Sequence, residues 1–283
     1  MLKKQLMIVT LCILLMSMLA ACGSNNKEEG TASNEGAALQ KKSLKIGATA
    51  GPYSDMVNKA IKPLMEEKGY KIEIVEFNDY VQPNKSLDNG SIDANLFQHI
   101  IYLNKFAQDN KLELSSVISV PTAPMGLYSN TIKSIDDIKE GSSLTIANDP
   151  ANLARSLLLL QDIGLVTIKD DADPATISDK DIENNVKNLK ITSLEAAQLP
   201  RTLDSSNLSV VAGNFALAAG MDLTSALQLE NMSENYRNVV AVRTTDAESQ
   251  FAKDLKEVIE SAEFEQKIDE QFQGFSKPEW MTK

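Results

Sequence analysis

The side chains best suited to hold a ligand fall in two short stretches of the chain. In the first, Phe97, His99 and Tyr102 stand at the end of a predicted strand and the start of a predicted helix. Ligands of open α/β sheets collect where strands end. Three rings at such a point can form an aromatic wall against which an apolar or thioether side chain packs well. The alternative is that His99 caps the helix while Phe97 belongs to the core.

The second stretch, 148–155, begins a helix whose first turn is suited to an anion. Asp149 is its predicted N-cap and Pro150 its first helical residue. The free N–H groups of a helix N-terminus attract anions, and Asn152 and Arg155, three residues apart, share a helix face. Arg155 can hold a carboxylate through two parallel hydrogen bonds. An internal salt bridge between Arg155 and an Asp or Glu is an equally open alternative.

The residues for common catalytic and metal chemistry are few. The chain has one His and two Cys, too few for a zinc site made only of Cys and His. We find no Ser-His-Asp or Cys-His nucleophile set, no P-loop and no GxGxxG motif. Paired carboxylates such as Asp136-Asp137 and Asp170-Asp171 lie in polar stretches typical of solvated turns. We therefore expect a binding protein rather than an enzyme, with no cofactor and no metal.

Charge and length narrow the class further. The 283 residues carry 28 Lys and Arg against 39 Asp and Glu, a formal net charge of −11. Nucleic-acid binding needs basic clusters, so this balance argues against a nucleic-acid partner. Apolar residues make up 43% of the chain, an ordinary value for a soluble globular protein. The length suits two domains of about 100–150 residues each.

The first 22 residues predict an exported lipoprotein. Lys3 and Lys4 precede an uncharged run, 6–21, which is shorter than the roughly 20 residues of a spanning helix and typical of a signal peptide. Leu19-Ala20-Ala21-Cys22 resembles the bacterial lipobox, in which the Cys is lipidated and becomes the mature N-terminus. We expect a signal peptide at 1–21 and a lipid anchor on the extracytoplasmic face of the cell membrane. The alternative is an ordinary signal peptide with a chance Cys22.

The polar stretch that follows predicts a tether, and the folded body begins near residue 44. Residues 22–43 are mostly small or polar and cannot bury a core. Strands and helices then alternate, which indicates an α/β fold. Pro63 should kink the first helix or divide it in two. Strands are expected near 44–50, 71–77, 92–97, 115–120, 125–129, 142–148, 188–194 and 238–243. Helices are expected near 53–69, 83–89, 100–110, 134–140, 150–164 and 195–204, with terminal helices from 251 to 272. The stretch 208–217 is expected to be a strand that runs into a helix.

Long motifs along this body resemble those of one family. They include LKIGATAGPYSDM (44–56), DANLFQH (93–99), NDPANLARSLLLL (148–160), LKITSLEAAQLPRTLD (189–204) and GFSKPEW (274–280). These runs resemble the methionine-binding lipoproteins of bacterial ABC importers, the NlpA lipoprotein family, over about 44–280. The resemblance implies a two-lobed fold of the periplasmic-binding-protein type II class, with two crossover strands and a ligand cleft between the lobes. Lobe one would comprise 44–128 and 239–283, and lobe two 129–238.

The resemblance also implies roles for particular residues. In the family an aromatic cluster holds the methionine side chain, and Arg and Asn hold its carboxylate and amino group. Carried over by motif, the aromatic wall consists of Tyr80, Phe97, His99 and Tyr102. The polar clamp consists of Asn152 and Arg155. The implied partners are a methionine-like amino acid, the permease subunits of an ABC importer with its cytoplasmic ATPase, and the membrane through the lipid anchor.

One stretch departs from the family pattern. The family usually reads Val-Ile-Asn-Gly-Asn-Tyr-Ala before the last helix of lobe two, and its first Asn contacts the ligand. Here Ala212 replaces that Asn, while Asn214 remains two residues on, on the same face if the strand stays extended. Asn214 either replaces the missing contact or keeps a structural role. Two alternative ligands therefore remain, a methionine-containing dipeptide and another amino-acid-like solute. A further alternative to transport is a surface lipoprotein that serves in adhesion or scaffolding.

Overall fold

The computed structural model describes residues 42–174 and 176–283. The predicted signal peptide, Cys22 and nearly all of the tether lie outside these residues. The described residues belong to one compact unit. Within them, no helix has both the length and the apolar character needed to cross a membrane.

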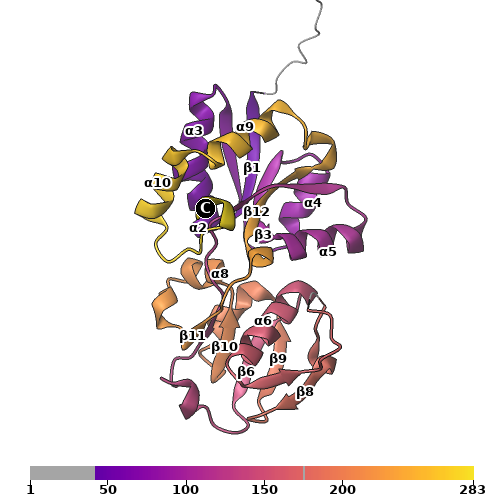
Figure 1. Cartoon of the computed structure of the whole chain (residues 1–283), viewed down its shortest axis with the longest axis vertical. Coiled ribbons are helices and arrows are strands. Elements are labelled where there is room, and N and C mark those ends of the chain that lie inside the picture. Colours follow the sequence, from indigo (N-terminus) through magenta and orange to yellow (C-terminus); the bar gives the residue numbers. More distant parts are fainter. Residues whose placement is uncertain (1–41, 175) are drawn as a thin grey trace, which may run out of the picture. The chain divides into compact units, whose positions relative to one another are not determined.

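The first sheet defines lobe one, at the top of Figure 1. Its strand order is β2-β1-β3-β12-β4, with β1 parallel to β2 and β3, and β12 antiparallel to β3 and β4. The strands are β1 (Ser43–Thr49), β2 (Lys71–Phe77), β3 (Ala94–His99), β4 (Leu114–Val120) and β12 (Asn238–Arg243). Because β12 comes from the far end of the sequence, the chain returns to lobe one after building lobe two.

Helices cover both faces of this sheet. Side chains alternate along β12: Val240 and Val242 pack into a core shared with the first and last helices, whereas Val239 and Ala241 pack against Leu87 and Leu103 of α4 and α5. The helices of this lobe are α2 (Pro52–Met56), α3 (Lys62–Glu67), α4 (Gln82–Asp88), α5 (Ile100–Asn110), α9 (Gln250–Ile259) and α10 (Ala262–Gln271).

The second sheet defines lobe two, and its order is β11-β5-β10-β6-β9. Strands β6, β9 and β10 are parallel, and β5 runs antiparallel to β10. The strands are β5 (Gly126–Tyr128), β6 (Ser143–Ala147), β9 (Lys190–Leu194), β10 (Leu208–Val211) and β11 (Gln228–Leu229). The helices are α6 (Pro150–Asp162), α7 (Leu199–Thr202) and α8 (Gly213–Ala218). The α/β fold class is as predicted.

The first helical segment is interrupted, as Pro63 predicted. A π-helical turn, η1 (Val57–Ile61), stands between α2 and α3, and Pro63 lies in the first turn of α3. Proline donates no backbone hydrogen bond and crowds the preceding turn. The wider π turn just before it accommodates that loss without ending the segment.

Several boundaries differ from those predicted. Strand β3 lies two residues later than the expected 92–97, so the strand itself carries Phe97 and His99. Strand β5 belongs to the second sheet, so the chain crosses between the sheets before residue 126 rather than at 128. The predicted helix near 134–140 is only a 3₁₀ turn, η2 (Ile135–Asp137).

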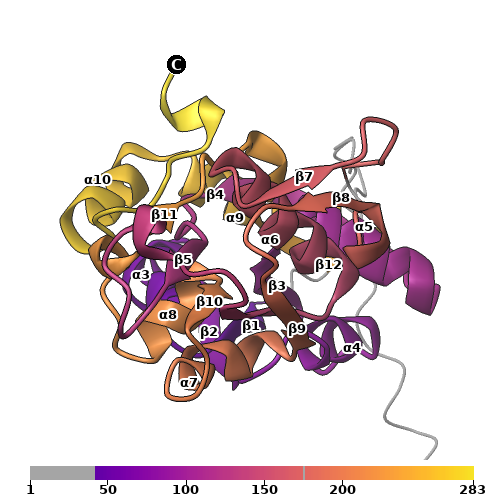
Figure 2. The same cartoon turned by 90° about the horizontal axis from the view of Figure 1, so that it is seen from below.

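The structure also contains elements that the sequence did not predict. A hairpin of β7 (Val166–Ile168) and β8 (Ile182–Asn185) lies at the outer edge of lobe two (Figure 2). The remaining 3₁₀ turns are η3 (Asp179–Asp181), η4 (Ala196–Gln198), η5 (Leu223–Ser225), η6 (Glu234–Tyr236), η7 (Thr244–Asp246) and η8 (Glu279–Met281). Of these, η6 matters for the site because it leads from lobe two back into β12.

Candidate ligand-binding site

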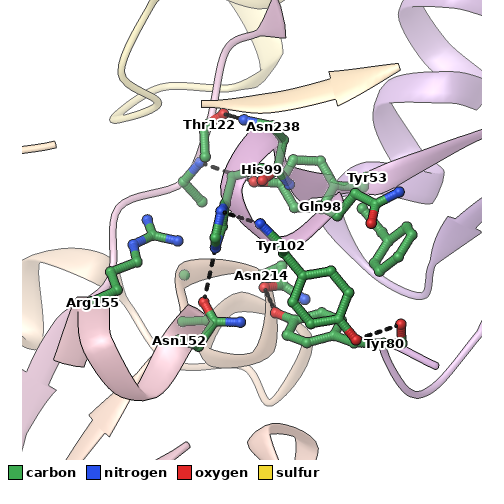
Figure 3. Close-up of a pocket in the computed structure, with 14 residues that line it drawn as sticks. Tyr53, Tyr80, Gln98, His99, Tyr102, Thr122, Asn152, Arg155, Asn214 and Asn238 are labelled. Carbon is green, nitrogen blue, oxygen red and sulfur yellow. Dashed lines mark hydrogen bonds between the residues drawn. The ribbon is translucent and has the colours of Figure 1, made fainter. Parts of the chain in front are cut away.

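A cavity lies where the two lobes meet (Figure 3). Lobe one contributes Tyr53, Tyr80, Phe97, Gln98, His99 and Tyr102. The connecting segments contribute Thr122, Ala123 and Asn238, and lobe two contributes Asn152, Arg155, Ala212, Gly213 and Asn214. The structure thus brings all seven predicted ligand-binding residues together.

The lobe-one side of the cavity is a cluster of rings. The ring centroids of Tyr80 and Phe97 are 5.8 Å apart, those of Tyr80 and Tyr102 also 5.8 Å, and those of Phe97 and Tyr102 5.9 Å. The Tyr102 hydroxyl donates a hydrogen bond to the backbone oxygen of Tyr80 at 2.9 Å. Strand β3, helix α5 and the loop before α4 therefore hold one another in place through this cluster, which forms a continuous apolar surface.

His99 both caps α5 and lines the cavity, so both interpretations of this residue are correct. Its Nδ1 accepts a hydrogen bond from the Tyr102 backbone N–H at 3.2 Å. The proton of the neutral ring must then sit on Nε2, which lies 3.2 Å from the Asn152 Oδ1 and donates to it. Burial, aided by the positive charge of Arg155, lowers the pKa of His99 to about 3. His99 is therefore a neutral member of the wall at physiological pH.

Asn152 is fixed by partners on both sides of its amide. Its Nδ2 donates to both carboxylate oxygens of Asp149 at 3.1 Å, and its backbone N–H donates to the Asp149 Oδ1 at 2.9 Å. Asp149 is the N-cap of α6, as the sequence predicted. Its contacts direct the Asn152 oxygen toward His99, so the first turn of α6 meets lobe one through a polar contact. Burial raises the pKa of Asp149.

Arg155 forms a buried ion pair with Glu230. Its Nε donates to Glu230 Oε2 at 2.8 Å and its Nη2 donates to Oε1, and the two side chains are only 5% and 6% exposed. Glu230 Oε1 also accepts from the Met125 backbone N–H at 2.6 Å. Burial lowers the pKa of Arg155, but the charge and hydrogen bonds of Glu230 outweigh this and leave it raised. The structure thus contains the internal salt bridge that stood as the alternative.

The geometry of this pair leaves part of the guanidinium for other partners. Both bonds to Glu230 use the Nε–Nη2 edge of Arg155. Arg155 also lines the cavity, and its guanidinium carbon lies 5.0 Å from the centre of the Tyr236 ring. A guanidinium has five N–H donors in a planar fork. Its Nη1 is therefore not engaged by Glu230.

The departure at position 212 lies directly on the cavity. The strand does not stay extended through this stretch, because β10 ends at Val211 and α8 begins at Gly213. Ala212 is the N-cap of α8 without a side-chain hydrogen bond, and Asn214 lies in the first helical turn. Both residues still line the cavity. Gly213 allows the close approach, because a Cβ there would lie 2.5 Å from the Pro124 oxygen.

The comparisons agree with this geometry. The family model described as NlpA lipoprotein matches residues 44–280. The chain belongs to this family. Among its relatives, the D-methionine-binding lipoprotein MetQ of Salmonella typhi is 36% identical over 93% of each chain. The MetQ of Escherichia coli is also 36% identical, over 84% of this chain and 88% of that protein.

Solved structures of the family share the fold. A nutrient-binding protein from Burkholderia cenocepacia, bound to methionine, is 38% identical with a TM-score of 0.78, over 82% of this chain and 97% of its own. The crystal structure of the methionine-binding protein MetQ is 35% identical with a TM-score of 0.79, over 84% of this chain and 98% of its own. Both solved structures therefore share the fold described above.

Several cavity residues of this family member carried no local signal in the sequence. Tyr53 reaches the cavity from α2, and its hydroxyl accepts from the Ala123 backbone N–H at 3.3 Å. Glu230, which holds Arg155 from outside the cavity, also gave no local signal, although its side chain is only 6% exposed. Thr122 and Asn238 meet only because the two connecting segments run side by side, where the Asn238 backbone N–H donates to Thr122 Oγ1 at 2.7 Å.

Proposed function

We propose that this chain is the substrate-binding lipoprotein of an ABC importer, and that it binds methionine or a close relative in the interlobe cavity. One observation carries the proposal: five rings and a buried Arg line the same cavity. This arrangement suits an amino acid with a thioether side chain, because sulfur packs well on aromatic rings and a guanidinium pairs with a carboxylate. The methionine-binding relatives support the same ligand.

In this proposal Arg155 serves two carboxylates at once. Glu230 holds the Nε–Nη2 edge, and the ligand carboxylate takes the donors on Nη1. The Arg155–Glu230 pair is neutral by itself, so a ligand that brings both a carboxylate and an ammonium adds no net charge to a buried site. Burying unbalanced charge is expensive. The cavity therefore favours a zwitterionic amino acid, with Asn152 and Asn214 as the neighbouring amides.

Binding of a methionine dipeptide is the second candidate, and Ala212 is the observation that favours it. Ala212 lines the cavity with a methyl group where the family usually has an amide. A ligand whose amino group is already in a peptide bond needs fewer partners at that position and more room. The two candidates make opposite predictions for restoring the Asn, which are given below.

The proposal includes a lipid anchor on Cys22 and a role at the extracytoplasmic face of the membrane. The lipobox-like sequence supports the anchor, and two acyl chains hold a protein stably where one does so only marginally. The bound solute would then be passed to permease subunits driven by a cytoplasmic ATPase. Nothing in the proposed role requires catalysis by this chain.

Calorimetry of the mature body with L-methionine, D-methionine and a methionine dipeptide tests the ligand. We expect at least one of the three to bind with a one-to-one stoichiometry, while leucine and glutamate bind far more weakly. Failure of all three to bind would refute the assignment to methionine-like ligands.

The anchor has a separate test. Cys22→Ser should prevent lipidation, so that the body is released into the medium or stays uncleaved. The neighbouring substitution Ser24→Ala is the control and should leave anchoring unchanged. A Cys22→Ser protein that remains fully membrane-bound and is cleaved at the same site would show that Cys22 is not the anchor.

A further inference from the structure

Tyr80 of lobe one is held by two consecutive residues of lobe two. Its hydroxyl donates to the Asn214 Oδ1 at 2.6 Å. Its ring lies against the Phe215 ring, with centroids 4.8 Å apart and planes tilted by 33°. Both residues belong to the first turns of α8. Separation of the lobes at this point must therefore break a buried hydrogen bond and a ring contact together.

This contact divides two cavities. Tyr80 lines the ligand cavity, whereas Phe215 lines a second and larger one. The second cavity also lies between the lobes, since Phe77 of lobe one and Arg201 of lobe two face it. The Tyr80–Phe215 contact thus stands between the ligand cavity and the larger second cavity. A ligand that enters or leaves by this side must pass it.

Asn214 has one amide atom bonded and the other without a partner. Its Oδ1 accepts from Tyr80. Its Nδ2 is buried and has no hydrogen-bond partner among residues 42–174 and 176–283. The residue is 4% exposed and lines the ligand cavity. Because the Tyr80 bond fixes which way the amide faces, Tyr80 determines where this donor is presented (Figure 3).

A buried donor without an acceptor is unfavourable. The closed arrangement is therefore complete only when an acceptor atom reaches Asn214 Nδ2, and a bound ligand can supply one. Contact with the ligand and closure of the lobes then depend on the same side chain. Asn214 can therefore donate a hydrogen bond to the ligand, which Ala212 cannot do with its side chain.

We propose that Tyr80 and Asn214 form a latch that couples ligand contact to lobe closure and sets how slowly the ligand is released. In this latch the Tyr80 hydroxyl has a positioning role, because it acts through Asn214. Phe215 supports the latch from the outer side. This inference rests on the proposed function, because it takes the ligand of the interlobe cavity as the acceptor.

Stopped-flow kinetics with methionine test the latch, using whichever stereoisomer the wild type binds. Tyr80→Phe keeps the ring and removes the hydroxyl, so the dissociation rate should rise about tenfold while the association rate changes less than twofold. Asn214→Ala should raise the dissociation rate by at least as much. The double variant should match Asn214→Ala alone, because the hydroxyl acts only through that amide.

Tyr128→Phe is the matched control. Its hydroxyl is also buried, but it lies in the core of lobe two and does not line the ligand cavity. This variant should leave both rates unchanged. An unchanged dissociation rate in Tyr80→Phe would overturn the proposal, and so would effects of the two substitutions that simply add in the double variant.

A second measurement separates the latch from the ligand assignment. If the wild type binds no form of methionine, the proposed function fails, but the latch still predicts a difference in the free protein. Small-angle X-ray scattering should then give a larger radius of gyration for Tyr80→Phe than for wild type, because fewer molecules stay closed. Equal radii in that case would overturn the latch as well.

Discussion

On the lobe-one side of the cavity the rings contact one another, whereas on the lobe-two side Arg155 and Asn152 are held by partners outside the cavity. Tyr80, Phe97 and Tyr102 form one cluster with centroids less than 6 Å apart. Arg155 instead depends on Glu230, and Asn152 on Asp149. The first wall is built by direct packing, the second by hydrogen bonds from a surrounding layer.

This difference assigns separate tasks to the two walls. A cluster of rings is neutral and attracts any apolar or thioether group of suitable size, so lobe one should contribute affinity with modest selectivity. Oriented charges and amides distinguish ligands by their head groups, because an unpaired buried polar group is costly. Lobe two should therefore determine which head group is accepted. Each of the four predictions below tests this division.

Loss of the Arg155 side chain should have the largest effect. Arg155→Ala should weaken methionine binding by about 3 kcal/mol or more, because the ligand carboxylate and Glu230 would both be buried without a cation. Arg155→Lys should recover only part of this loss, since an ammonium cannot form the two-edged contact. Calorimetry measures both. Arg201→Ala, an exposed Arg of the same lobe, should bind like wild type, and wild-type affinity in Arg155→Ala would remove this residue from the site.

Loss of a ring from lobe one should cost less and leave head-group selectivity intact. Phe97→Ala should weaken methionine binding by about 2 kcal/mol, close to the value of burying one apolar side chain. The ratio of affinities for L- and D-methionine should stay within threefold of wild type. Phe272→Ala, in the lobe-one core outside the cavity, should lower stability without this loss of affinity. A changed stereoisomer ratio in Phe97→Ala would contradict the division of tasks.

Restoring the family amide at position 212 should change how strongly lobe two binds the ligand's head group. If methionine is the ligand, Ala212→Asn should tighten its binding by about 1–2 kcal/mol, or up to roughly thirtyfold. If the ligand is a dipeptide, the larger side chain should weaken dipeptide binding while methionine stays weak. Titration of both ligands against both proteins decides between the candidates. Equal affinities throughout would place position 212 outside the ligand's reach.

Because His99 is buried in its neutral form, the free energy of unfolding should depend on pH. The pKa of His99 is lowered to about 3 by burial, against about 6.5 in the unfolded chain. The unfolded state therefore takes up a proton below pH 6.5 that the folded state refuses until near pH 3. The His99 contribution to the free energy of unfolding should be fully present above pH 6.5 and should fall by about 1.4 kcal/mol for each pH unit between about 6.5 and about 3.

Urea unfolding at pH 7.5, 6.5 and 5.5 measures this slope. His99 is the only His in the chain, so a His99→Gln variant should lose that part of the pH dependence. The same slope in both proteins would mean that His99 is not held neutral by the fold.

The sequence predicted the two walls to different extents, for reasons that follow from the same comparison. Phe97, His99 and Tyr102 are neighbours in the sequence, and a strand that leads into a helix brings such neighbours to one face. Glu230 lies 75 positions from Arg155, so only the assembled lobe two identifies it as the partner. The alternating pattern also could not show that β10 ends at Val211, which places Asn214 on a helix rather than on an extended strand.

Mass spectrometry of the small molecule that copurifies with the protein tests the central claim most directly. The mature body would be purified under native conditions, denatured, and its released ligand identified, with Arg155→Ala treated in parallel. We expect methionine, or a short peptide that contains it, from the wild type, and much less from Arg155→Ala. Release of a solute that lacks a carboxylate or a methionine side chain, in equal amounts from both proteins, would contradict the proposed site.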